Sequence, residues 1–138
     1  MCAVTHPFRL LTQTFVYTVG MPVEPDGEIF SRIVRREIPA RIIYQDDDVT
    51  AFYDVNPIAP THVLIVPNQM IRTLNDATLA DEHLLGKMLL TAQRVARDLG
   101  ISESGYRIVI NVNKQAGQSV FYLHFHVLGG RRMSWPPG

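Results

Sequence analysis

The order of predicted elements places the chain in the α+β class, with one long helix on the apolar face of an antiparallel sheet. Patterns of apolar residues predict a short helix, two or three strands, a long helix and two further strands. The connections between the strands are short, which favours antiparallel pairing. No internal repeat interrupts this order. The 138 residues are therefore read as one folded domain.

Composition narrows the classes of function. The 13 basic and 13 acidic side chains cancel, so charge gives no reason to expect a nucleic acid or an anionic membrane as partner. The single cysteine, Cys2, excludes an internal disulfide framework and a cysteine-based zinc site. No apolar run is long enough to span a bilayer. We expect a cytoplasmic protein.

The N-terminal residues are expected to lie outside the domain. Arg9 is the one charged residue among the first twenty, and the segment lacks both the continuous apolar stretch of a signal peptide and an Arg-rich amphipathic pattern. We therefore expect a loosely ordered extension over residues 1–27 and a domain over residues 28–138.

The first elements of the domain are a short helix and a hairpin. The helix begins at Glu28 and ends before Pro39. The segments Arg41–Gln45 and Val49–Tyr53 have strand composition, and the acidic turn 46–48 between them predicts a hairpin. The apolar residues of the short helix recur at helical spacing and are Ile29, Phe30, Ile33 and Val34.

A buried strand, the long helix and two more strands follow. His62–Val66 comes after the rigid loop 56–60, and the last strands are predicted over Tyr106–Val112 and Val120–Leu128. Thr78 and Asp81 resemble a capping box before the long helix, and Gly100 is its expected C-cap. The helix carries one apolar face formed by Leu85, Met88, Ala92, Val95 and Leu99.

The last strand carries the strongest functional signal. Apolar residues alternate along it with Tyr122, His124 and His126, so the two histidines share one face of the sheet. Such a pair can be a nucleophile with its acid–base partner, two ligands of a metal, or two hydrogen-bonded histidines without chemistry. The turn 116–119 upstream has backbone N–H groups that could meet an anion. Together these features favour phosphorus chemistry.

Other candidates have a structural reading beside the functional one. His62 opens a strand of the same sheet and is either a site residue or a surface histidine at a strand end. Asp54 either caps the turn at Asn56 or accepts hydrogen bonds from a sugar. In the structural reading, Asn111 only satisfies backbone hydrogen bonds at a strand end. In the same reading, Gly117-Gln118-Ser119 is only a tight turn. His83 is expected on the solvent side of the long helix.

These residues carry a family resemblance. The segment 122–128 resembles the histidine-triad (HIT) motif, in which three histidines alternate with apolar residues, and the match extends over about Glu28 to Gly138. Its further elements resemble the nucleotide-binding HINT branch of the family. They are Ile-Pro-Ala (38–40), Ala-Phe-x-Asp (51–54), Ala-Pro-Thr-His (59–62), Gly-Gln-Ser (117–119), Leu-Gly-Gly-Arg (128–131) and Trp-Pro-Pro-Gly (135–138). Tyr122 stands where the family has its first histidine.

The resemblance implies a HIT-like fold, a five-stranded antiparallel sheet with one long and one short helix. It further implies a homodimer that binds purine nucleoside monophosphates and hydrolyses the P–N bond of their phosphoramidates, without a cofactor or a metal. The central histidine attacks the α-phosphorus and forms a nucleotidyl-histidine, which water then cleaves. Tyr122 keeps the backbone carbonyl that accepts a hydrogen bond from this nucleophile, so attack need not be lost.

By position in the motif, His124 is the nucleophile. His126 contacts the phosphate and shuttles protons, Ser119 stands near the departing amine, and His62 belongs to the outer hydrogen-bond chain. The residues expected to bind the nucleotide hold phosphate, ribose or purine. They are Gly117, Gln118, Ser119, Asn111 and His126 for the phosphate, Asp54 for the ribose, and Ile29, Phe30, Ile33, Ile38, Phe52 and Val55 around the nucleoside.

Three hypotheses follow. The leading one is a purine nucleoside phosphoramidase. The second is a nucleotide-binding or scaffolding protein whose turnover is impaired by Tyr122. The third is a zinc-binding module that uses His124, His126 and His62.

Overall fold

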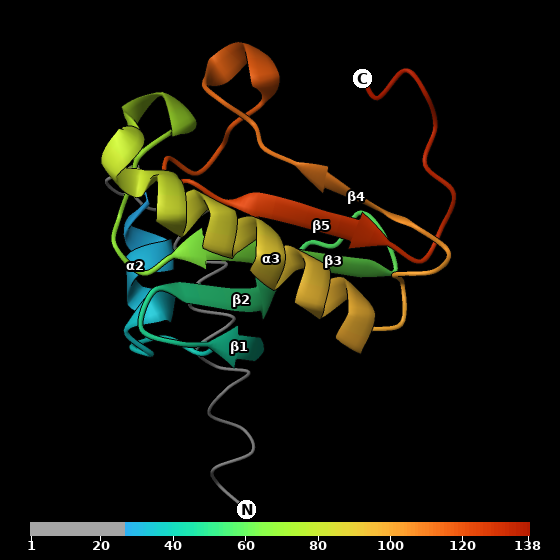
Figure 1. Cartoon of the computed structure of the whole chain (residues 1–138), viewed down its shortest axis with the longest axis horizontal. Helices are drawn as coiled ribbons and strands as arrows, with labels where there is room; N and C mark the ends of the chain where they lie inside the picture. The colour runs from blue at the N-terminus through green and yellow to red at the C-terminus, as the bar shows by residue number, and fades with distance from the viewer. Residues whose placement is uncertain (1–26) are drawn as a thin grey trace, which may run out of the picture.

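The computed structural model describes residues 27–138, and the predicted N-terminal extension lies outside the described residues, apart from Gly27. A five-stranded antiparallel sheet has the order β1-β2-β3-β5-β4. The α-helix α3 crosses one face of this sheet, and the short helix α2 lies at its other side (Figure 1). The predicted α+β class, with five strands, one long helix and one short helix, is confirmed.

Helix α2 (Glu28–Val34) begins at the predicted residue. It ends several residues before Pro39, the residue that was expected to end it. Gly27 precedes it with φ 89°, and a Cβ there would lie 2.7 Å from the Phe121 carbonyl oxygen, so only glycine fits. The helix ends because Arg36 adopts a left-handed φ of 58°. Glu37 N–H then bonds to Arg32 O, which satisfies a carbonyl at the helix end.

Strands β1 (Ile42–Gln45), β2 (Val49–Tyr53) and β3 (Thr61–Pro67) follow the prediction within one residue. The capping box of Thr78 and Asp81 is present, although it caps the 3-10 turn η2 (Leu79–Asp81) that leads into α3 (Glu82–Asp98). Gly100 has φ 74° directly after α3. The five residues expected on the apolar face of the helix all pack into the main core.

The last two strands are shorter than the sequence suggests. β4 is Tyr106–Val109, and β5 is Phe125–Gly129. The pairing of β5 with β3 stops at Ile65 opposite Phe125, and Leu123 N–H instead donates to Ile71 O. Pro67, which ends β3, has no N–H to extend the ladder. Residues 120–124 therefore keep the inward and outward alternation without belonging to a strand.

The two faces of the sheet bury different clusters. The larger core lies between the sheet and α3 and includes Val63, Ile65, Phe125 and Val127. The smaller cluster lies between the other face and α2 and joins Phe30 to Tyr122. Because side chains alternate along a strand, the histidines fall on the face of the smaller cluster.

Candidate active site

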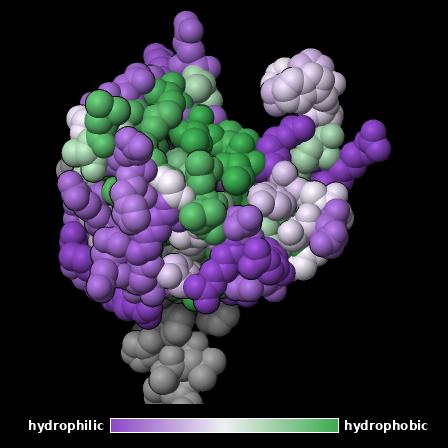
Figure 2. Space-filling model, viewed as in Figure 1, coloured by the Kyte–Doolittle hydropathy of each residue, from purple (hydrophilic) through white to green (hydrophobic). Residues whose placement is uncertain are grey.

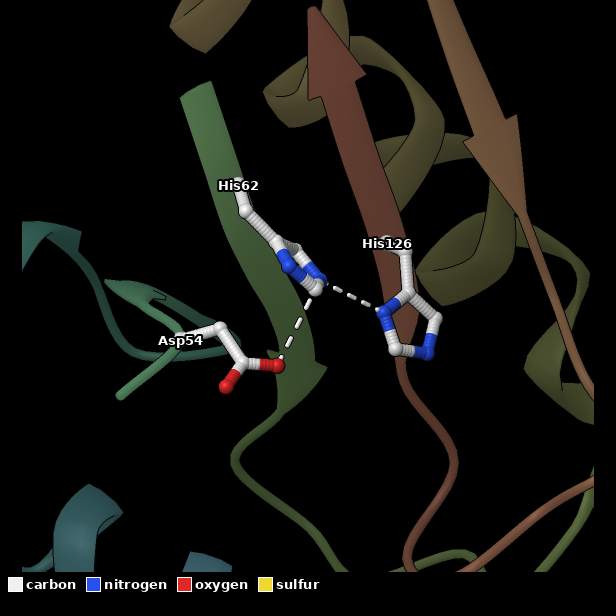
Figure 3. A group of neighbouring side chains, drawn as sticks. All are labelled: Asp54, His62 and His126. Carbon is white, nitrogen blue, oxygen red and sulfur yellow. Dashed lines mark hydrogen bonds and ion pairs between the residues drawn. The ribbon is translucent and has the colours of Figure 1, made fainter. Parts of the chain in front are cut away.

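Neighbouring strands position two histidines. Leu64 of β3 stands opposite His126 of β5, so His62 is the diagonal neighbour of His126 on the same face. His62 Nε2 lies 2.9 Å from His126 Nδ1, and Figure 3 shows the two rings turned toward one another. His62 is buried, with 3% of its surface exposed. The surface reading of His62 is therefore wrong.

His124 has one ring nitrogen fixed by the backbone. Its Nδ1 lies 2.6 Å from the Tyr122 carbonyl oxygen, which can only accept, so Nδ1 carries the proton. Nε2 then holds a lone pair. Burial lowers the pKa of His124, although the Tyr122 hydrogen bond raises it in part. At neutral pH the ring is uncharged and can act as a nucleophile.

His126 lies beside His124, with ring centroids 4.9 Å apart. Burial, together with the smaller effects of the neighbouring His124 and His62, lowers the pKa of His126 to about 4. Its Nε2 is buried and has no hydrogen-bond partner in the described part of the chain. A buried polar atom without a partner costs free energy, so this nitrogen is suited to meet a ligand.

Asp54 takes the capping role considered for it, and it also contacts His62. Its Oδ1 accepts from Asn56 N–H at 2.8 Å, which caps the turn after β2. Its Oδ2 lies 3.3 Å from His62 Nε2 (Figure 3). The carboxylate raises the pKa of His62 in part, but burial is the larger effect and the net pKa is lowered.

The Tyr122 hydroxyl is hydrogen-bonded to backbone carbonyls at the end of β3 and not to a histidine. It donates to Pro67 O and lies 3.1 Å from Asn68 O, and the residue is fully buried. Burial raises its pKa to about 12. Tyr122 therefore contributes only its carbonyl oxygen to the site. The third imidazole of the site, beside those of His124 and His126, is that of His62.

The residues expected around the purine largely gather next to His124. Phe30, Ile33 and Phe52 are buried, with Ile29 and Ile38 half-buried beside them, and the Phe30 ring lies 5.2 Å from the His124 ring. Val55 is 70% exposed and does not join this cluster. Two further buried members of the cluster were not predicted, although they lie on the same face of β3 as His62. They are Leu64 and Val66.

The loop before His124 contains the turn 116–119, and the structure corrects one expectation for its backbone amides. Gln118 N–H donates to Asn113 O, so it does not have the free amide expected for a phosphate. The Gln118 side chain accepts from Asn113 N–H and donates to Arg72 O and Val120 O, which holds the loop together. Gly117 has φ 84°, Ser119 is exposed, and Asn111 is half-buried just after β4. His83 is exposed on α3, as expected.

One group of side chains has the spacing of a metal site. The ligand atoms of Asp54, His62 and His126 all lie within 4.8 Å of one another. This set differs from the zinc hypothesis, because Asp54 replaces His124, whose Nδ1 is taken by the Tyr122 carbonyl.

The fold and the site together define a small α+β protein with a buried histidine, His124, whose Nε2 is suited to act as a nucleophile. The HIT domain model matches residues 35–133. A purine nucleoside phosphoramidase from Escherichia coli is 53% identical over 103 residues, which is 75% of this chain and 87% of that protein. An uncharacterised HIT-like protein from Synechocystis sp. is 56% identical over 113 residues, covering 82% of this chain and 98% of the relative.

Solved structures agree with the sequence relatives. A HIT family hydrolase from Legionella pneumophila superposes with a TM-score of 0.78 at 47% identity, covering 80% of this chain and 98% of that one. The chain belongs to the HIT domain family. The expectation of a hydrolase is confirmed by these relatives.

Within residues 27–138, no helix is long and apolar enough to cross a membrane. The cytoplasmic location stays a prediction.

Proposed function

We propose that the protein hydrolyses purine nucleoside phosphoramidates to a nucleoside monophosphate and an amine. The observation that carries this proposal is the hydrogen bond from His124 Nδ1 to the Tyr122 carbonyl. It leaves Nε2 unprotonated in a ring whose pKa is lowered by burial. An uncharged imidazole is a good nucleophile, and it becomes a good leaving group when protonated.

The reaction has two displacements at phosphorus. His124 Nε2 forms a bond to the α-phosphorus while the P–N bond breaks, and the amine leaves with a proton drawn from solvent near the exposed Ser119. Water then attacks the nucleotidyl-histidine, releases the monophosphate and restores His124. The unpartnered Nε2 of His126 faces the phosphoryl group in this scheme. Apolar residues beside His124 receive the purine, and Asp54 accepts from the ribose.

The relative from Escherichia coli supports a phosphoramidate as substrate, because its name states that activity. The position of the Tyr122 hydroxyl supports turnover over the alternative of a nucleotide binder with impaired chemistry. That hydroxyl is bonded to Pro67 O, so the substitution leaves the carbonyl contact to His124 in place.

We also propose a homodimer. β4 pairs only with β5 in the described sheet, so one edge has free backbone groups. Figure 2 shows apolar side chains gathered on the face that carries α3. Two leucines of α3, Leu89 and Leu90, are 47% and 64% exposed. Light scattering at micromolar concentration should give twice the mass of one chain, and a monomer mass would contradict this part.

Turnover of a fluorogenic adenosine phosphoramidate by metal-free protein tests the proposal. His124→Ala should abolish turnover and leave AMP binding within about tenfold, because it removes the covalent step and keeps the apolar cluster. His83→Ala is the matched control, since His83 is exposed on α3 far from the site in sequence, and should retain activity. Binding of AMP without turnover by the wild type would favour the nucleotide-binder alternative.

A further inference from the structure

A backbone amide reaches the histidines from the loop between β2 and β3. Ile58 N–H donates to His62 Nδ1 at 3.1 Å. A backbone amide nitrogen cannot accept, so His62 Nδ1 carries no proton. Neutral His62 therefore has its single ring proton on Nε2. The Ile58 side chain is 63% exposed, which leaves its peptide group as the part that acts on the site.

The proton on His62 determines the proton on His126. His62 Nε2 lies 2.9 Å from His126 Nδ1, so the N–H of His62 donates and His126 Nδ1 accepts. Neutral His126 then carries its own proton on Nε2, the buried atom that has no partner among residues 27–138. One amide thus sets the tautomers of two rings.

The tautomer of His62 also bears on the metal hypothesis. His62 Nε2 could bind a metal only after losing the ring's last proton or its bond to Ile58. Metal-ligating histidines are ordinarily neutral, with the second nitrogen protonated. The group of Asp54, His62 and His126 is therefore better suited to an ordered chain of hydrogen bonds than to a metal.

The Ile58 peptide is held from its other side. Arg131 donates to Ile58 O from Nη2 at 3.1 Å and from Nε at 3.3 Å. Gly130 brings this part of the chain close to the loop. It has φ 86°, and a Cβ on it would lie 2.8 Å from Pro60 Cβ, so a larger residue would push the segment away.

We propose that Arg131 and the Ile58 peptide are positioning groups for the reaction, and that they fix His126 as a neutral hydrogen-bond donor through Nε2. The proposal rests on the proposed function for the identity of the reaction. In this state His126 stabilises a phosphoryl oxygen by donation. It does not transfer its proton to the amine, since losing that proton would leave an anionic ring in a buried site.

Nitrogen-15 NMR of the histidine rings tests the tautomers without substrate. Metal-free wild-type protein at neutral pH should show His62 and His126 protonated on Nε2 and His124 protonated on Nδ1. Arg131→Ala should shift His62 and His126 toward mixed tautomers. Its matched control, Arg132→Ala, removes an adjacent exposed guanidinium and should leave all three rings unchanged. Protonation of His126 on Nδ1 in the wild type would overturn the proposal.

Kinetics give a second readout. Arg131→Ala should lower kcat about tenfold and change KM less than about twofold, because a positioned donor acts mainly on the transition state. Ile58→Pro removes the amide proton itself and should have the larger effect, whereas Ile58→Ala keeps that proton and should behave like the wild type. Unchanged tautomers in Arg131→Ala and in folded Ile58→Pro protein would refute the positioning role. The predicted tautomers in a wild type without turnover would support the tautomer assignment and contradict the proposed function alone.

Discussion

Replacing Tyr122 by phenylalanine should separate stability from catalysis. The hydroxyl is fully buried and donates to Pro67 O, with Asn68 O 3.1 Å away. Its removal leaves buried carbonyl oxygens without this donor, which should lower the free energy of unfolding by about 1–3 kcal/mol. The Tyr122 carbonyl that accepts from His124 is unaffected, so kcat should stay within about tenfold, a barrier change below about 1.4 kcal/mol.

Tyr122→His completes this test because it restores the family's first histidine. Urea unfolding gives the stability of each variant, and the fluorogenic phosphoramidate gives its kcat. If the first motif position acts through its backbone, Tyr122→His should also change kcat less than about tenfold. A rise by the about 10²–10⁴ typical of a positioned acid or base would refute the reasoning and show that the missing imidazole matters.

Three further predictions concern the Asp54 carboxylate, the buried histidines and Gly27. Asp54→Asn should weaken ribonucleotides by about 1.5–3 kcal/mol more than 2′,3′-dideoxynucleotides in calorimetry, and equal losses would reduce Asp54 to a turn residue. Burial lowers the pKa of His62, His124 and His126, so the unfolded chain binds more protons. Urea midpoints of metal-free protein should therefore be highest above about pH 6.5, the ordinary pKa of histidine. They should fall as the pH is lowered toward about 4, the pKa of His126. A midpoint that does not change with pH would contradict buried neutral rings. Gly27→Ala should destabilise the fold by more than about 1 kcal/mol, because its φ is 89° and the Phe121 carbonyl is 2.7 Å from the new Cβ. Gly86→Ala on α3, where nothing lies within 4 Å, should instead be stabilising by about 0.5–1 kcal/mol, and a loss there equal to that of Gly27→Ala would refute the clash.

Features that depend on local periodicity were predictable from the sequence. The apolar face of α3 follows from apolar residues at steps of three and four, and the capping box before the helix and Gly100 after it lie where predicted. The shared face of His124 and His126 follows from alternation alone, even though only His126 lies in a regular strand. His62 could be placed in the same sheet, but its pairing with His126 depends on the β3–β5 register, which the sequence does not encode locally.

Features that depend on which backbone groups pair outside the regular strands escaped prediction. The strand ends differ because Leu123 N–H bonds to Ile71, far away in sequence. The side-chain position of Tyr122 depends on carbonyl oxygens at the end of β3. The Gln118 amide, expected to bind an anion, is used by Asn113 within its own loop. In each case the competing partner is a backbone group, and sequence patterns carry little information about which backbone group will be free.

The central claim is that His124 is the nucleophile, and capture of the covalent intermediate tests it most directly. Wild-type protein is mixed rapidly with adenosine phosphoramidate, quenched in alkali, where phosphohistidine bonds survive, and mapped by mass spectrometry of its peptides. His124 and His126 fall in one tryptic peptide, so fragment ions must separate them. We expect one adenylyl group on His124 and none in the His124→Ala variant. An adenylyl group on His126, or undiminished turnover by His124→Ala, would contradict it.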